Sequence, residues 1–153
     1  MRRSLAVLIL LLLGAAPGFG QSARVGIYKL VSFAIEIDGQ AALEVMGKSP
    51  RGSLILMPTR WVHIITGENR KFGTSVEEKS ALLDSLIAYT GPYRLDGNQI
   101  VVAVDASWND NRTQVTRTWQ RDGNRLSIAT APAPYSRDPS KMAITRVVWE
   151  KVE

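Results

Sequence analysis

The sequence contains no cysteine, which excludes disulfides, thiolate catalysis, cysteine-ligated metal sites and an N-terminal lipid attached to cysteine. Its single histidine leaves too few nitrogen ligands for a zinc or copper site of the usual kind. Neither a Gly-x-Ser-x-Gly elbow nor a glycine loop of the phosphate-binding type is present. The motifs therefore predict no catalytic residue, no metal ligand and no cofactor.

Long apolar runs are also missing, apart from one near the N-terminus. Arg2 and Arg3 precede an apolar run at 5–13, and small residues follow it. This pattern predicts a secretory signal peptide at 1–23, with cleavage after Gly20 or after Ala23 equally well placed. The run is far shorter than the roughly 18 to 20 residues of a membrane-spanning helix. We expect an exported protein, periplasmic or secreted, with no membrane span after cleavage.

The charge balance is only moderately basic, with 19 Lys and Arg against 14 Asp and Glu and a net charge of +5. Loss of Arg2 and Arg3 with the leader lowers the net charge to +3, so nucleic acid is not an expected partner. The remaining charge is uneven, because residues 112–146 hold seven basic residues against Asp122 and Asp138. The seven are Arg112, Arg117, Arg121, Arg125, Arg137, Lys141 and Arg146.

Residues 24–153 suit one domain, organised around a meander at 91–131. Two Asp-Gly-Asn tripeptides, at 96–98 and 122–124, separate runs rich in Val, Ile, Thr and Trp, which predicts two hairpins joined by a turn at 109–111. The predicted strands are 26–37, 53–57, 61–66, 92–95, 99–108, 112–121, 125–131 and 142–151, with a proline-rich loop at 132–140. Eight antiparallel strands predict an all-β fold of the smallest common closed barrel type.

One segment, at about 75–89 between the third and fourth strands, has the spacing of a helix. Ser or Thr three residues before Glu77 and Glu78 fits a capping box, and an apolar stripe runs on to Tyr89. Gly91 and Pro92 are expected to end the helix. We expect the helix to lie against the barrel or to close one end of it.

Several motifs occur in an order and spacing that are together fairly specific. They are the opening Gly-Ile-Tyr-Lys-Leu-Val-Ser-Phe at 26–33, the segments 49–55, 73–78 and 88–93, the hairpin 117–126 and the closing Val-Val-Trp-Glu-Lys-Val at 147–152. By these motifs the chain resembles the bacterial lipocalin-like domain family, small eight-stranded barrels of the calycin type. The resemblance implies a binding barrel, in which a small apolar or amphipathic molecule enters an open end.

Five residues are candidates for a cavity wall or rim. His63 shares a strand face with Trp61. If it points inward, it is the one group on the cavity wall able to change charge near neutral pH. The alternative is an ordinary hydrogen-bonded strand residue. Asp105 interrupts an apolar run and faces either water or the lumen, where Arg117 on the next strand is its natural partner. Trp108, like Trp61, lies beside a predicted turn and is a candidate for the rim.

Two arginines stand on otherwise apolar strand faces. Arg117 is either an anchor for a carboxylate or phosphate head group or a structural residue. The resemblance implies that a basic side chain of the last strand, Arg146 or Lys151, packs over Tyr28 and closes the barrel base. We expect Tyr28 and Trp149 to lie on neighbouring strands of that base.

These observations favour an exported barrel that binds a small apolar or amphipathic ligand, which can be anionic, in its lumen. One alternative is a small isomerase or hydrolase that uses His63 with Asp105 or Glu36 as acid and base. A second alternative is a surface-interaction module, in which the basic residues of 112–146 grip an acidic polymer or partner. The sequence gives no indication of the oligomeric state.

Overall fold

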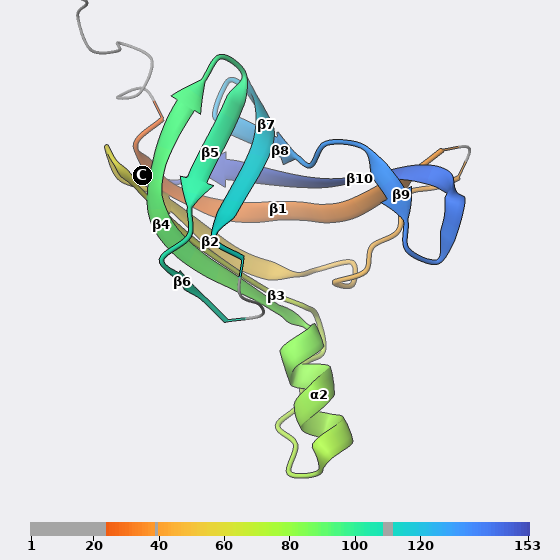
Figure 1. Ribbon diagram of the computed structural model, residues 1–153. Helices are drawn as coiled ribbons and strands as arrows, with labels where there is room; N and C mark the ends of the chain where they lie inside the picture. Colours follow the sequence, from red (N-terminus) through yellow and green to blue (C-terminus); the bar gives the residue numbers. More distant parts are fainter. Residues whose placement is uncertain (1–23, 39, 109–111) are drawn as a thin grey trace, which may run out of the picture.

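The structure, a computed structural model, describes residues 24–38, 40–108 and 112–153. These residues form ten strands and one short helix, and eight of the strands close into an antiparallel barrel (Figure 1). The predicted all-β, eight-stranded barrel is therefore confirmed. The predicted leader at 1–23 and the predicted turn at 109–111 lie outside the described residues.

The barrel closes because its first strand pairs with both its second and its last. The strands follow one another around the wall in chain order, and β1 also pairs with β10. The barrel strands are β1 (Gly26–Ile37), β2 (Arg51–Leu56), β3 (Arg60–Thr66), β4 (Leu86–Asp96), β5 (Gln99–Ala103), β7 (Gln114–Asp122), β8 (Arg125–Ala129) and β10 (Asp138–Lys151). Two short strands are added at the sides: β6 (Ala106–Ser107) pairs with β4, and β9 (Ala133–Tyr135) pairs with β10.

Both Asp-Gly-Asn tripeptides form the predicted hairpin turns. In each, the aspartate pairs with the residue after the asparagine, so a Gly-Asn dipeptide makes the turn. Gly97 and Gly123 have φ angles of 57° and 56°, a left-handed conformation that glycine adopts without the steric cost of a Cβ atom. These two turns position β4, β5, β7 and β8 and with them half of the barrel wall.

The helix, α2 (Val76–Asp84), begins where the capping box predicts. The Ser75 hydroxyl accepts a hydrogen bond from the Glu78 N–H at 3.2 Å, and the Glu78 carboxylate accepts one from the Ser75 N–H at 3.0 Å. None of the helix residues is buried, and Figure 1 shows α2 projecting from one end of the barrel. The first of the two expected placements, against the barrel, is therefore wrong. At the barrel end, Leu83 and Asp84 in the last turn of α2 line the cavity described below.

The predicted end of the helix at about residue 89 is also wrong. Leu86 and Tyr89, which fit the helical stripe, lie in β4 and pair with β3 from Thr66 onward. Tyr89 and Tyr93 are buried with Gly91 between them, which is the two-residue period of a strand. The ladder with β3 satisfies the backbone of this segment, so sheet pairing outweighs its helical spacing.

Gly91 does not end a helix but allows two strands to approach each other. A Cβ atom at this position would lie 1.9 Å from the carbonyl oxygen of Ala103, the last residue of β5. The predicted strand 99–108 is interrupted here: β5 ends at Ala103, and the Asp105 N–H donates to the Thr90 carbonyl at 3.0 Å. The predicted loop 132–140 likewise contains β9 and the beginning of β10.

A bulge in β1 decides which of its side chains face inward. The pairing with β10 shifts between Leu30 and Ser32, so Tyr28 and Leu30 are buried, Val31 is 40% exposed, and Phe33 is buried again. The extra residue of a bulge reverses the alternation of faces.

The barrel base has the predicted pair of aromatic residues but not the predicted arginine. Leu30 pairs with Trp149, and both Tyr28 and Trp149 are buried. Arg146 precedes an inward residue and therefore faces outward, where its Nε and Nη2 atoms donate to the Glu36 carboxylate at 2.6 and 3.0 Å. It does not pack over Tyr28, whereas Lys151, the alternative to Arg146, is the β10 partner of Tyr28 in the ladder.

A different arginine lies at the base. The guanidinium carbon of Arg24 lies 3.7 Å from the centroid of the Trp119 ring, a cation–π contact, and the Tyr28 hydroxyl donates to the Arg24 carbonyl at 2.7 Å. Arg24, just before β1, thus packs at this end of the barrel. No helix in the described ranges has the length and apolar content needed to span a membrane.

Candidate functional site

The barrel encloses a cavity of about 480 Å³. It lies at the barrel end from which α2 projects, where exposed Val45 and Leu83 form part of its lining. Its deeper lining is largely aliphatic and aromatic, and includes Phe33, Ile35, Met46, Ile87, Ile128 and Val147. A cavity of this size, apolar with few polar groups, has the form of a small-molecule site.

Four rings pack together in one wall of the cavity. The centroid of His63 lies 4.7 Å from that of Tyr89, 5.4 Å from that of Trp149 and 5.8 Å from that of Trp61, each in an edge-on arrangement. Trp61 and Tyr89 are stacked with 6.1 Å between centroids. Neighbouring inward positions of β3, β4 and β10 supply these rings, so this wall is fixed by the sheet itself.

His63 is an inward-facing and unusually isolated polar group. Its side chain is 7% exposed, and neither ring nitrogen has a hydrogen-bond partner within the described part of the chain. Burial lowers the pKa of His63 to about 3, and the charges of Arg117 and Arg112 contribute to the lowering. The imidazole is therefore neutral at ordinary pH, so the expected charge change near neutrality is wrong, and so is the ordinary hydrogen-bonded role.

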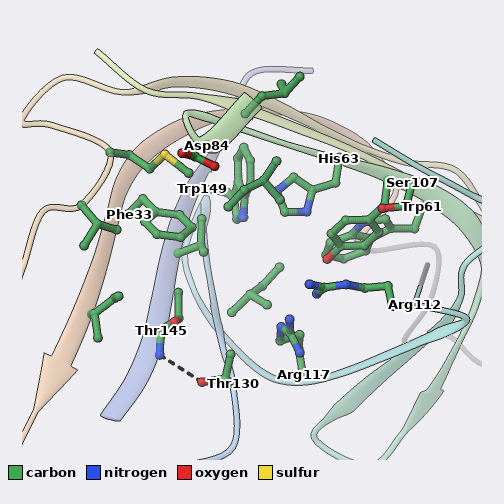
Figure 2. Close-up of a pocket in the computed structure, with 18 of the residues that line it drawn as sticks. Phe33, Trp61, His63, Asp84, Ser107, Arg112, Arg117, Thr130, Thr145 and Trp149 are labelled. Carbon is green, nitrogen blue, oxygen red and sulfur yellow. Dashed lines mark hydrogen bonds between the residues drawn. The ribbon is translucent and has the colours of Figure 1, made fainter. Parts of the chain in front are cut away.

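Two arginines bring positive charge into the cavity. Arg112, just before β7, and Arg117, within β7, both line it, and Figure 2 shows Arg112 extending into the space beside Trp61. Arg117 is half-buried, and its Nη1 donates to the carbonyl of Thr116 at 2.8 Å. Burial lowers the pKa of the Arg117 guanidinium, and the neighbouring Arg112 lowers it further.

Arg117 was a candidate anchor from the sequence, whereas Arg112 stood out only as one of seven basic residues. The register explains the position of Arg117, which pairs with the inward residue Ile100. Arg112 lies outside the regular strand, so no alternation rule could have placed it in the cavity.

The other polar lining residues lie on different sides of the cavity. The Thr130 hydroxyl oxygen accepts a hydrogen bond from the Thr145 N–H at 3.0 Å, which leaves its own proton to donate. In Figure 2, Thr130 lies on the same side as Arg117, whereas Asp84, at the end of α2, lies across the cavity from both arginines. Sequence patterns gave no signal for Asp84 or Thr130.

Two predicted site residues lie outside the cavity lining. Asp105 is on the outer surface, where its carboxylate pairs with the Arg60 guanidinium at 2.5 Å, so the expected pair with Arg117 does not form. Trp108 is 62% exposed and lines a shallow outer groove. Trp61 does line the cavity, but it is buried in the wall instead of standing at the rim.

The geometry does not assemble the acid–base site of the first alternative. Asp105 pairs with Arg60 and Glu36 with Arg146, both on the outer surface, so neither carboxylate reaches His63. Of the seven basic residues of 112–146, Arg112 and Arg117 line the cavity, and Lys141 and Arg146 pair with Asp138 and Glu36 at 3.7 and 2.6 Å. Within residues 24–38, 40–108 and 112–153, no three His, Asp or Glu side chains are grouped as metal ligands.

Comparison with known proteins gives one match. A family model described as a lipocalin-like domain matches residues 25–152, which covers every strand of the barrel. No individual curated protein and no solved structure matched the chain at a significant level.

Proposed function

Because the chain belongs to the lipocalin-like domain family, we propose that it binds a small amphipathic anion in the lumen of its barrel. The family and the closed barrel support ligand binding in general. The class of ligand is inferred from the cavity lining, and the observation that carries it is an apolar cavity of about 480 Å³ with two arginines in its wall.

The apolar part of the ligand supplies most of the binding free energy. Each methylene group moved from water into the lining contributes about 0.8 kcal/mol, so a chain of eight carbons provides several kcal/mol before the costs of association. The barrel wall around the cavity is held by continuous strand pairing. Little free energy is therefore spent on forming the site.

The anionic group orients the ligand. Arg117 makes no ion pair with any described residue, and its one hydrogen bond is to the adjacent carbonyl of Thr116. A half-buried guanidinium that has no counter-ion among the described residues gains more from an anion than an exposed one does, because the surrounding dielectric is low. The ligand is expected to enter at the α2 end with its charge toward Arg117.

The proposal includes export of the protein. The leader predicted at 1–23 would carry the barrel out of the cytoplasm, so the ligand would be met in the periplasm or outside the cell. N-terminal sequencing of the protein recovered from its native host tests this step. A start at Gln21 or Arg24 supports it, and an intact Met1 contradicts it.

Ligand binding is tested by tryptophan fluorescence, since Trp61 and Trp149 lie in the cavity wall. Titration with octanoate and with uncharged octanol should give saturable changes, with octanoate bound about tenfold more tightly. Arg117→Gln should remove that difference while leaving octanol binding unchanged. Arg94→Gln, whose guanidinium pairs with Asp96 on the surface, is the matched control for charge.

No saturable response to either compound would contradict ligand binding in the lumen. Equal affinities for octanol and octanoate, unchanged in Arg117→Gln, would contradict only the anionic part.

A further inference from the structure

We propose that the ligand of the lumen is a hydroxylated aromatic acid, whose hydroxyl group forms a hydrogen bond with His63 in the aromatic wall. This inference rests on the proposed function, because it specifies the apolar part of the anion that the barrel would bind. Its starting point is a buried imidazole that lines the cavity and has no hydrogen-bond partner among the residues that the structure describes.

His63 is an exception in the core of the barrel. Apart from tyrosine and tryptophan, it is the one polar side chain in the buried core of the described residues. Tyr89, Trp149 and Trp61 contact its ring edge-on, and Figure 2 shows it between the two tryptophans. These contacts pack the ring but leave both nitrogens without a hydrogen bond. Leaving a buried polar group unpaired is costly, so a ligand that supplies the missing partner gains affinity.

The partner that suits this imidazole is an uncharged hydroxyl group. The pKa of about 3 leaves the ring neutral, with one N–H donor and one acceptor nitrogen. A hydroxyl group both donates and accepts, so it pairs with whichever nitrogen faces it in either tautomer. A second carboxylate on the ligand would instead carry an unpaired charge into an apolar wall.

The surrounding rings favour an aromatic carrier for that hydroxyl group. Trp61, Tyr89 and Trp149 stand beside His63, and Phe33 lines the same cavity. Aromatic rings in offset or edge-to-face contact gain more than their buried area alone provides. A ligand ring also holds its hydroxyl group in a fixed direction, which reduces the conformational entropy lost on binding.

One ligand can meet both His63 and Arg117. Both line the same cavity of about 480 Å³, and the charge of Arg117 lowers the pKa of His63, so the two groups act within one space. The ring of His63 is held by packing and not by hydrogen bonds, and the torsion about its Cβ–Cγ bond has a broad minimum. A small rotation therefore turns a nitrogen toward the ligand without breaking a hydrogen bond.

The test compares phenylpropanoate with its meta-hydroxy and para-hydroxy derivatives, which share the acid and the ring. Isothermal titration calorimetry at pH 7.5 measures binding, because phenols interfere with tryptophan fluorescence. The phenolic group is uncharged at this pH, since its pKa is about 10. We expect at least one of the two phenols to bind about tenfold more tightly than phenylpropanoate.

A variant assigns the preference to His63. His63→Phe keeps a ring in the wall and removes both nitrogens, so it should bind phenylpropanoate about as well as the parent protein and show no preference for the phenol. Phe33→Leu is the matched control, because it reshapes the same cavity without removing a hydrogen-bonding group and should retain the ratio of the parent protein. Circular dichroism verifies that each variant is folded.

A second measurement uses the unaltered protein. The sequence contains one histidine, so its ring nitrogens give a single pair of nitrogen NMR signals. The preferred phenol should shift one of these signals far more than phenylpropanoate does, because a hydrogen bond acts directly on the nitrogen. Equal shifts with both ligands would contradict a hydrogen bond to His63.

The possible failures are separable. If neither phenol binds more tightly than phenylpropanoate, or if the preference survives in His63→Phe, the inference is overturned and the lumen remains a binding site. The inference is also overturned if octanoate binds and none of the three aromatic acids does. If octanol and octanoate fail to bind as well, the proposed function itself fails.

Discussion

The burial of His63 makes a specific prediction about stability and pH. In the unfolded chain a histidine takes up a proton below about pH 6.5, whereas in the fold the pKa of His63 is about 3. Between these values the unfolded state binds more protons than the folded state, so stability falls as the pH falls. Above about pH 6.5 both states are neutral at this residue and no stability is lost.

The size of the effect follows from the width of this window. Each pH unit inside this window lowers the free energy of unfolding by about 1.4 kcal/mol. Lowering the pH from 6.5 to 5 should therefore reduce the free energy of unfolding by about 2 kcal/mol through His63 alone. The total free energy of unfolding of a domain of this size is roughly 5 to 15 kcal/mol. Carboxylates with lowered pKa values, such as Glu36 beside Arg146, add to the loss only at more acidic pH.

The assay is urea denaturation of the parent protein and of His63→Phe at pH 7.5, 6.5, 5.5 and 5.0, followed by circular dichroism. Any packing cost of phenylalanine is the same at each pH, so the informative quantity is how the difference between the two proteins changes. The variant should lose about 2 kcal/mol less than the parent protein between pH 6.5 and 5. Glu36→Gln, as a control, should follow the parent protein over this range. A difference that stays constant with pH would refute a buried neutral imidazole.

Two further predictions concern the barrel wall. Gly91→Ala would place a Cβ atom 1.9 Å from the Ala103 carbonyl oxygen and should lower the free energy of unfolding by at least about 2 kcal/mol. Gly97→Ala, with φ of 57° and open space around it, should lower it by about 1 kcal/mol. Equal losses in urea denaturation would contradict the close approach. Arg146→Gln removes a half-exposed ion pair with Glu36 and should cost less than about 1 kcal/mol, a loss that shrinks in 1 M salt. A loss of several kcal/mol, unaffected by salt, would show that this pair holds the barrel closed.

The sequence predicted the strands best where the signal is local. The bounds of β1 match the prediction, and both Asp-Gly-Asn turns form as expected, because turn chemistry and the two-residue period act over a few residues. The segment after α2 was misassigned because Leu86 and Tyr89 satisfy a helical spacing as well as a strand spacing. Pairing with β3 decides between the two, and β3 lies some twenty residues earlier in the chain.

The cavity residues were predicted correctly only within regular strands. The alternation of inward and outward side chains fails where the backbone is irregular. His63, Trp61 and Arg117 lie within regular strands, and all three line the cavity as the alternation indicates. Asp105 lies just beyond the end of β5, where it turns to the surface and pairs with Arg60. Arg112 enters the cavity from a segment without a repeating pattern.

The amino-acid sequence by itself thus determined the number of barrel strands, the positions of the hairpins and the start of the helix, since all of these depend on neighbours along the chain. Only the tertiary structure decided that a cavity remains inside the barrel and that two arginines share it. The reason is geometric: the β1 bulge and the early end of β5 change the faces of the residues that follow, and the free volume depends on how all eight strands meet.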